Sequence, residues 1–401
     1  MIRFSEMVLP GHPDKLCDQI ADAVLAEAYR ADPQAYGQIE VAAWCDEFFL
    51  TGGIATRKPL AVPLEEIVRR VGREVGYTGS NAIQADRWVV RDAVCRDVRD
   101  PREWTEHVND QCLVVGYAFG DARTRFLPPE HYLAHVFREA LTAACREPLA
   151  PPGVRARGEG SLPGKGEGLQ GQGPDGKLLV RMREEGERWT LEHVLVTLQQ
   201  LESTPFMDVC AGVAECLSLA YEGVRRADPR WLRPWAEVDL LVNPNGPLIN
   251  GGPDGDNGQT GRKLAMDFYG PRVPQGGGAL SGKDLTHIDR AGSYAARRAA
   301  VQAVSTGASE CLVKVAYAPN VDAPLDVVWE MRGSGSRTVR EAFAHSSIRR
   351  EAAEWGACVE RGVGDHFWSE APWNEAPMWD EAAGKLDEGG LKADLGYCPR
   401  R

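Results

Sequence analysis

Apolar residues recur every fourth position in some stretches and in short runs in others, and the two patterns predict alternating helices and strands. Leu16, Ile20 and Val24 mark one face of an amphipathic helix, and Pro13 suits its first turn. The same spacing predicts further helices over residues 60–75, 130–145, 211–226 and 286–306.

Short apolar runs bounded by glycine, proline or polar residues predict the strands. They are expected over residues 48–54, 111–119, 177–182, 189–199, 238–242, 312–317 and 327–331. The strands over 177–182 and 189–199 are expected to pair across the polar turn Glu184-Glu185-Gly186. Sheets and helices recur in a loosely similar order three times, which predicts an α+β protein of three pseudo-symmetric, sheet-plus-helix domains. The expected domains are N-terminal, central and C-terminal, over residues 1–102, 103–232 and 233–401.

Residues 151–177 interrupt this pattern inside the expected central domain. Nine glycines lie between Gly153 and Gly176, among almost no apolar residues, which predicts a flexible loop or linker. The tail beyond about Arg337 is charged and contains tryptophan, and no clear periodicity predicts an element there.

The composition is that of a folded, water-soluble protein: of 401 residues, 43% are hydrophobic and 26% are charged. The net charge of −12 argues against nucleic acid or an anionic membrane as a partner, because both reward clustered lysine and arginine. No apolar run approaches the length that spans a bilayer. The N-terminus lacks a signal-peptide pattern, and the ten cysteines show neither CxxC nor zinc spacing, so a cytoplasmic protein with reduced thiols is expected.

The first candidate site is GHPDK, residues 11–15, at the start of a predicted helix. Free backbone N–H groups and the positive end of the helix dipole attract an anion there, and His12 and Lys15 add donors. Asp14 and Asp18 are four residues apart on one helical face, and Mg²⁺ prefers carboxylate oxygen. The alternative is ordinary helix capping with a surface lysine.

The second candidate is GGPDGDNGQTGRK, residues 251–263. Its acidic residues invite a calcium-loop interpretation, which fails because Gly258 and Ala265 stand where an EF-hand needs Asp or Asn and Glu. What remains is a glycine-rich loop that ends in two cations, Arg262 and Lys263. The alternative is a solvated turn with surface charge.

The third candidate is GGGALSGKDLTHID, residues 276–289, which from Gly277 has the glycine and lysine spacing of a P-loop. A P-loop needs a buried strand before it and a hydroxyl after the lysine. Residues 269–275 contain a glycine and two prolines, and Asp284 follows Lys283, so the P-loop interpretation is disfavoured.

A fourth candidate is the pair His131 and His135, at metal-ligand spacing beside Glu130. No third ligand is in view, so a structural helix is the favoured interpretation.

Four long motifs together carry a family resemblance. GHPDKLCDQIADAV, GGPDGDNGQTGRK, GGGALSGKD followed by IDR and SYAAR, and NDQCLVVGYAF resemble segments of methionine adenosyltransferase (S-adenosylmethionine synthetase). The likeness is dense over 3–30 and 236–320, thinner over 40–140, and poor over 150–230 and beyond about 335. In this resemblance GGGALSGKD is the polyphosphate loop, and the P-loop match is accidental.

The resemblance implies an S-adenosylmethionine synthetase-like fold and a homodimer or homotetramer with active sites between subunits. It implies that the methionine sulfur attacks C5′ of ATP, and that triphosphate leaves and is hydrolysed to pyrophosphate and phosphate. Two Mg²⁺ ions and one K⁺ are the implied cofactors.

The resemblance also implies roles for individual residues. Catalysis would fall to His12, Arg262 and Lys283. ATP and polyphosphate would be bound by His12, Lys165, Asp256, Arg262, Lys263, Ala279, Lys283 and His287. Methionine would be bound by Ile54, Asp110 and Asp256, Mg²⁺ by Asp14 and Asp289, and K⁺ by Glu40.

Several positions depart from the family pattern. Pro10 and Ile54 each replace a glutamate, Leu248 replaces an adenine-stacking phenylalanine, and His287 replaces a lysine. The phosphate and metal groups are mostly kept while the amino-acid and adenine contacts change, which suggests retained catalysis with loosened or shifted substrate recognition. The alternatives are an enzyme for a methionine analogue, a non-catalytic regulatory homologue that binds nucleotide or a partner subunit, and a disfavoured ATP-dependent phosphotransferase.

Overall fold

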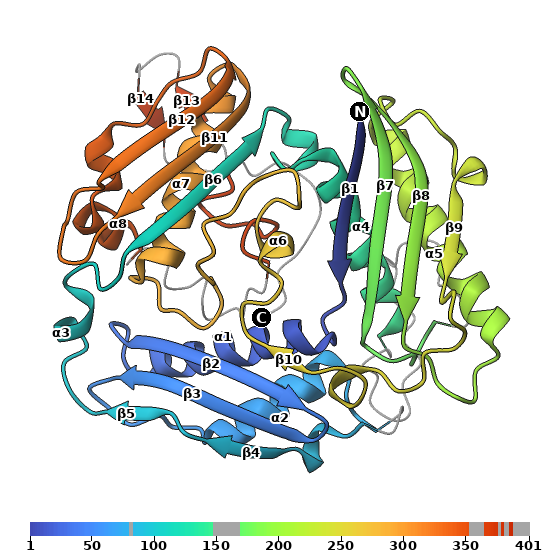
Figure 1. The fold of residues 1–401 in the computed structure, drawn as a ribbon, viewed down its shortest axis with the longest axis horizontal. Helices are drawn as coiled ribbons and strands as arrows, with labels where there is room; N and C mark the ends of the chain where they lie inside the picture. Colours follow the sequence, from blue (N-terminus) through green and yellow to red (C-terminus); the bar gives the residue numbers. More distant parts are fainter. Residues whose placement is uncertain (80–82, 147–168, 353–364, 376–377, 381–384, 388–401) are drawn as a thin grey trace.

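The computed structural model describes residues 1–401 except 80–82, 147–168, 353–364, 376–377, 381–384 and 388–401. Three sheets lie around a central group of loops (Figure 1), and helices pack on them. This mixture of helices and sheets confirms the predicted α+β fold.

The first sheet is covered by two long helices, α4 (Pro129–Cys145) and α5 (Phe206–Ala227). Its strands, in spatial order, are β1 (Ile2–Val8), β7 (Gly176–Glu185), β8 (Arg188–Leu198) and β9 (Asp239–Val242). β7 and β8 form the hairpin expected from the polar turn between them.

The second sheet packs on α1 (Pro13–Ala31) and α2 (Leu64–Val75). Its strands are β10 (Gly258–Gln259), β2 (Tyr36–Trp44), β3 (Glu47–Ala55) and β4 (Val89–Asp92), with β5 (Cys95–Asp97) also paired to β3. A 3₁₀ turn (Ala85–Arg87) lies between α2 and β4, and the short helix α3 (Arg102–Thr105) follows β5.

The third sheet packs on α7 (Ile288–Ser305), against which α8 (His345–Ala352) lies. Its strands, in spatial order, are β12 (Asp326–Gly333), β11 (Ala308–Tyr317) and β6 (Cys112–Phe119). The remaining elements are α6 (Leu264–Asp267), the small hairpin of β13 (Met378–Asp380) and β14 (Lys385–Asp387), and short 3₁₀ turns.

Each sheet combines strands from distant parts of the chain. β1 pairs with β7, β10 pairs with β2, and β6 pairs with β11, although each pair is split between two of the domain ranges expected from the sequence. Strand pairing is non-local, and an apolar run carries no record of its partner. The domain ranges 1–102, 103–232 and 233–401 therefore stay a proposal. Each sheet contains strands from more than one of these ranges.

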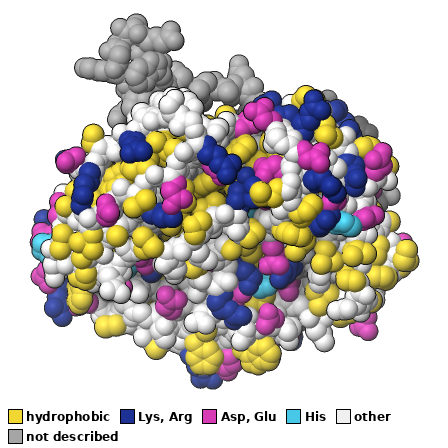
Figure 2. All heavy atoms as spheres, turned by 45° about the horizontal axis from the view of Figure 1, so that its top comes forward, with side chains coloured by type: hydrophobic (Ala, Val, Ile, Leu, Met, Phe, Trp, Pro, Cys, Tyr) yellow, Lys and Arg dark blue, Asp and Glu magenta, His cyan; other side chains and the backbone are white. Residues whose placement is uncertain are grey.

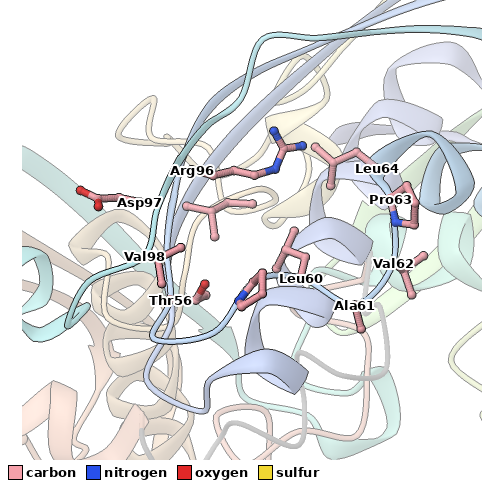
Figure 3. Close-up of a pocket in the computed structure, with 11 residues that line it drawn as sticks. Thr56, Leu60, Ala61, Val62, Pro63, Leu64, Arg96, Asp97 and Val98 are labelled. Carbon is pink, nitrogen blue, oxygen red and sulfur yellow. The ribbon is translucent and has the colours of Figure 1, made fainter.

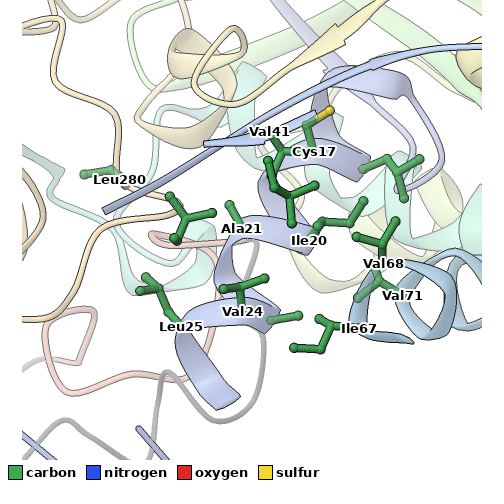
Figure 4. Packing of buried hydrophobic residues seen from close by; sticks show 14 of the residues in the cluster. Cys17, Ile20, Ala21, Val24, Leu25, Val41, Ile67, Val68, Val71 and Leu280 are labelled. Atoms are coloured by element: carbon green, nitrogen blue, oxygen red, sulfur yellow. The ribbon is translucent and has the colours of Figure 1, made fainter. Parts of the chain in front are cut away.

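The core beside the second sheet holds α1 in place. Ile20 and Val24 of α1 pack with Val41 of β2 and Val68 of α2 (Figure 4), and all four side chains are almost fully buried. Burying one such side chain contributes about 1.5–3 kcal/mol. This packing fixes the direction of α1 and so places its N-terminus among the central loops.

Among the helices that the structure describes, none is both long enough and apolar enough to cross a bilayer.

Candidate active site

The N-terminus of α1 presents the first group of polar side chains. His12 is the N-cap residue, and its Nδ1 accepts a hydrogen bond of 3.2 Å from the Asp14 backbone N–H. Burial, followed by the charge of Lys263, lowers the pKa of His12 to about 4. Because Nδ1 is an acceptor, the neutral ring carries its proton on Nε2.

The loop of residues 251–263 lies across this helix start. Asp14 is fully buried, and its carboxylate accepts a 2.9 Å hydrogen bond from the Gln259 N–H and pairs with the Lys263 ammonium. The Arg262 Nε lies 3.4 Å from the same carboxylate. Two cations and one carboxylate of the two predicted segments therefore meet at one place.

The loop of residues 276–289 is tied to the edge of β2. The Ile39 N–H donates to Gly282 O at 2.7 Å, and the Gly282 N–H donates to Asp22 Oδ1 of α1 at 3.0 Å. Asp284, which stands where a P-loop has a hydroxyl, instead accepts from Thr286 at the turn into α7. Residues 268–275 form turns and irregular chain rather than the strand that a P-loop needs.

Lys283 and Asp289 form the second charged pair of the site. The Lys283 ammonium contacts the Asp289 carboxylate, and the Cys112 thiol of β6 donates to Asp289 Oδ1 at 2.6 Å. Burial raises the pKa of Asp289, but Lys283 and the thiol outweigh it and hold the pKa below its ordinary value. The Asp289 carboxylate is therefore ionised. Asp289 and Asp14 each lie against a lysine ammonium.

Comparison with known proteins identifies the family. The chain matches the model of the S-adenosylmethionine synthetase N-terminal domain over residues 1–96 and that of the C-terminal domain over 250–352. A protein named S-adenosylmethionine synthase from Parvibaculum lavamentivorans is 31% identical over 92% of this chain and 88% of its own. One of the same name from Methylobacterium nodulans is 34% identical over 82% of this chain and 80% of its own.

The chain belongs to the S-adenosylmethionine synthetase family. This confirms the resemblance carried by the four motifs. The helix start with His12 and Asp14 lies within the matched N-terminal range, and both loops lie within the matched C-terminal range.

In this S-adenosylmethionine synthetase family member, most of the remaining predicted residues lie near the loops of residues 251–263 and 276–289. Asp256 and Asp110 are exposed, and their charges act on His12 and His287 respectively. Glu40 lies half-buried on β2; burial raises its pKa, and nearby Lys283 works against that rise. Ala279 packs against Gly261, so the two loops touch.

Two predicted residues lie elsewhere. Lys165 falls outside the described residues. Ile54 is a buried residue of β3 in the second sheet, where it lines a cavity of about 240 Å³. Leu60 and Val62, before α2, and Val98, after β5, also line this cavity (Figure 3). A hydrocarbon side chain in this setting offers no polar atom to an amino group.

His287 caps α7 in the way that His12 caps α1. Its Nδ1 accepts from the Asp289 N–H at 3.3 Å, and the ring is buried. Burial and the charge of Lys283 lower its pKa. The neutral ring therefore serves as a helix cap in this structure, and it does not bring the fixed positive charge of the lysine that it replaces.

Lys177 is a cation of the site that sequence reasoning missed. It is exposed at the start of β7, opposite Val8, and pairs with Glu6 at 2.8 Å. Its charge contributes to the lowered pKa of His12. The available signal was its position at the first residue of a predicted strand, directly after a glycine-rich stretch.

Lys15 does not serve as the anion donor expected from the GHPDK motif. Its side chain turns inward, where the ammonium lies 3.2 Å from Asp18 Oδ2 and contacts the Asp267 carboxylate. Burial by itself lowers the pKa of Lys15, but the two carboxylates raise it overall. Lys15 thus links α1 to α6 beneath the site.

Replacing Lys15 with methionine is expected to lower the free energy of unfolding by about 3–5 kcal/mol, because it leaves buried carboxylates without their cation. Urea unfolding measures this loss. The control is Arg70→Met, which breaks an exposed pair, 3.6 Å from Glu74, worth at most about 1 kcal/mol. Equal losses in the two variants would show that the Lys15 pair is no stronger than a surface pair.

His131 and His135 lie inside the protein on α4. The His131 Nδ1 is 2.9 Å from the Ser5 hydroxyl, and the His135 ring stacks on Trp368 at 4.5 Å. Both rings therefore pack between structural elements, as the helix interpretation of this pair expects. Among the described residues no group of three or more His, Cys, Asp or Glu could hold a metal.

Acid is expected to destabilise the protein partly through His131. Burial lowers its pKa to about 3, from an ordinary value of 6.5. Between these values the unfolded chain binds a proton that the folded protein does not, so stability is full above the upper value and falls with falling pH, by up to about 1.4 kcal/mol per pH unit. His131→Gln should show a shallower fall in Tm with pH, whereas exposed His107→Gln should not. Parallel curves for His131→Gln and wild type would contradict this.

Proposed function

We propose that the protein transfers the adenosyl group of ATP to the sulfur of methionine, which gives S-adenosylmethionine, and that it hydrolyses the released triphosphate to pyrophosphate and phosphate. The relatives named S-adenosylmethionine synthase support this. The observation that carries it is the meeting of Arg262, Lys263 and Lys283 with the carboxylates of Asp14 and Asp289 around two helix N-termini.

These residues suit the chemistry of a poor nucleophile and a highly charged leaving group. A thioether attacks weakly, so the bond from C5′ to oxygen must be easy to break. Each cation placed about 4 Å from the triphosphate would contribute about 4 kcal/mol at an effective dielectric constant of 20. Arg262, Lys263 and Lys283 are proposed for this role, with Lys177 as a fourth cation.

His12 is proposed to donate a hydrogen bond to the leaving oxygen. Its Nδ1 is held by the Asp14 N–H, so the proton is on Nε2 and available for donation. The lowered pKa keeps the ring neutral at physiological pH, so the ring acts as a hydrogen-bond donor rather than as a further cation. A preformed donor of this kind stabilises charge that develops in the transition state.

Mg²⁺ would be held by Asp14 and Asp289 together with phosphate oxygens, and K⁺ by Glu40. The donor set fits, because Mg²⁺ in phosphoryl sites takes one or two carboxylates and completes its shell with phosphate and water. When bound, the ions would neutralise polyphosphate charge. The lysines that now pair with the two carboxylates would then be available to the phosphates.

Recognition of the amino acid is proposed to depend on Asp110 and Asp256, which are exposed beside the loops. Ile54 contributes only apolar surface. A methionine analogue therefore remains a second candidate for the sulfur substrate, and the same assay with methionine analogues distinguishes the two.

The protein is proposed to act as a homodimer or homotetramer with active sites between subunits. Figure 2 shows hydrophobic side chains in several groups between charged ones on one face of the molecule. Large apolar side chains point outward from strands of all three sheets, among them Phe4, Trp44, Phe49, Leu113, Leu241 and Val328. A second copy packed on a sheet would bury such residues.

Ultracentrifugation of wild type and Trp44→Glu tests the assembly. The carboxylate introduced at position 44 is expected to weaken association of the subunits and to lower S-adenosylmethionine formation to the same extent. A monomeric wild type with full activity would refute sites shared between subunits.

One incubation tests the reaction. The protein with ATP, Mg²⁺, K⁺ and methionine should form S-adenosylmethionine, detected by mass, together with pyrophosphate and phosphate in equal amounts. Omission of methionine is the control. ADP with a phosphorylated acceptor would indicate a phosphotransferase, and tight ATP binding without turnover of any methionine analogue would indicate a regulatory homologue.

The proposed setting is the cytoplasm, which suits the eight described cysteines, all of them free thiols.

A further inference from the structure

A segment near the C-terminus, residues 365–375, is buried beneath the loop that carries Lys283. It lies outside both ranges matched by the family models. It forms turns rather than a helix or strand, yet His366 is fully buried and Phe367, Trp368 and Trp373 are at most 5% exposed. A stretch without regular structure that is buried to this degree is held by specific contacts.

Those contacts anchor the segment at several points. Asp365 pairs with Arg138 of α4, and the Trp368 Nε1 donates to Glu139. The Trp373 Nε1 donates to the His366 carbonyl at 2.6 Å, and the Trp373 ring stacks on Tyr294 with centroids 3.9 Å apart. The backbone of His366 is thus fixed independently of the loop that its side chain reaches.

The two ring nitrogens of His366 face two different elements. Nε2 lies 3.1 Å from the Ser281 hydroxyl, in the loop directly before Gly282 and Lys283. Nδ1 lies 2.7 Å from the Tyr294 hydroxyl of α7. The imidazole therefore bridges the Lys283 loop and the helix that follows it.

Arg290 extends this connection back to Lys283. Its Nε donates to the Tyr294 hydroxyl at 3.0 Å, and its Nη1 donates to the Lys283 carbonyl at 2.7 Å and to Asp22 at 2.8 Å. Arginine only donates, so the Tyr294 oxygen accepts from Arg290 and its own proton is available for His366 Nδ1. The His366 Nε2–H then donates to Ser281, and every bond has one donor and one acceptor.

We infer that His366 is a positioning residue that holds residues 281–283 in the geometry in which the Lys283 ammonium meets polyphosphate. The inference rests on the proposed function for its ligand, the triphosphate chain. His366 itself lies beneath the loop and acts through Ser281 and Tyr294. Packing alone would not require this role, because a phenylalanine would fill the same space without either hydrogen bond.

The test compares His366→Phe, which removes both hydrogen bonds, with His366→Gln, which keeps an N–H donor within reach of Ser281. His135→Phe is the matched control, because His135 is an equally buried histidine that contacts the same segment by stacking on Trp368. The quantities to be measured for each variant are the affinity for tripolyphosphate with Mg²⁺, by calorimetry, and kcat and the KM for methionine.

His366→Phe is expected to weaken tripolyphosphate binding about tenfold and to lower kcat by about 10–100-fold. A displacement of the Lys283 ammonium by about 1 Å is enough to lower the rate by up to about 100-fold. The KM for methionine should change little, His366→Gln should recover most of the loss, and His135→Phe should match wild type. Unchanged tripolyphosphate affinity in a folded His366→Phe protein, or equal losses in His135→Phe, would overturn the inference.

Ser281→Ala keeps the test decisive if His366→Phe does not fold. It removes only the hydroxyl, and it should weaken tripolyphosphate binding as His366→Phe does; binding equal to that of wild type would overturn the inference. Where both single variants fold, the double variant should lose no more tripolyphosphate affinity than either single variant, because both changes remove the hydrogen bond between His366 and Ser281. Additive losses of affinity would show that His366 does not act through Ser281. Tripolyphosphate binding can be measured without any turnover. A wild-type protein that binds tripolyphosphate but makes no S-adenosylmethionine would therefore refute the proposed function, and the role of His366 could still be tested by binding.

Discussion

Replacing Lys283 with glutamine is expected to lower kcat for S-adenosylmethionine formation by about 10²–10³-fold, the usual loss when one preformed donor to a developing charge is removed. The glutamine keeps most of the length of the side chain and removes its charge. The loop backbone should stay in place, because its bonds to Ile39 and Asp22 come from Gly282. The loss should therefore appear in kcat and in tripolyphosphate affinity, and Tm should fall as well, because the largely buried Asp289 carboxylate loses its cation.

Lys58→Gln is the control for this change. Lys58 is exposed three residues after the end of β3, and the same charge is removed there. Its kcat should equal that of wild type. A Lys283→Gln protein with nearly full activity would show that Lys283 is not needed to stabilise the leaving triphosphate, and would leave Arg262 and Lys263 as the cations of the site.

A single methyl group at position 282 is expected to be almost as damaging. Gly282 has a φ of +80°, and a Cβ there would lie 2.1 Å from the Ile39 carbonyl oxygen of β2. Alanine in this backbone region costs about 1–2 kcal/mol before any clash. The clash is with backbone, so the loop must move away from β2 and break the bond between Ile39 N–H and Gly282 O. We expect activity to fall at least about 100-fold, because Lys283 moves with the loop.

Gly277→Ala is a closely matched control. Gly277 lies in the same loop with a φ of +94°, and a Cβ there meets nothing within 4 Å. It should show the backbone cost alone, seen as a small fall in Tm with activity largely kept. If Gly277→Ala and Gly282→Ala were equally impaired, contact with β2 would not be what positions the loop.

The sequence alone determined the local elements and the family. The four-residue spacing of Leu16, Ile20 and Val24 predicted α1, and the polar turn near Gly186 predicted the β7–β8 hairpin, because both depend on neighbours within a few residues. The long motifs identified the family, and they predicted that His12, Asp14, Lys263 and Lys283 share one site.

Only the tertiary structure decided which polar side chains face the site and which hold it from beneath. Lys15 and Lys263 are both lysines in site motifs, yet one is buried against Asp267 and the other meets Asp14. Lys177 and His366 gave no signal in the motifs, because the polar groups that their side chains face lie at least 70 residues away along the chain. Periodicity records which apolar residues are buried, whereas the partner of a buried charge or imidazole is set by packing between elements far apart in the chain.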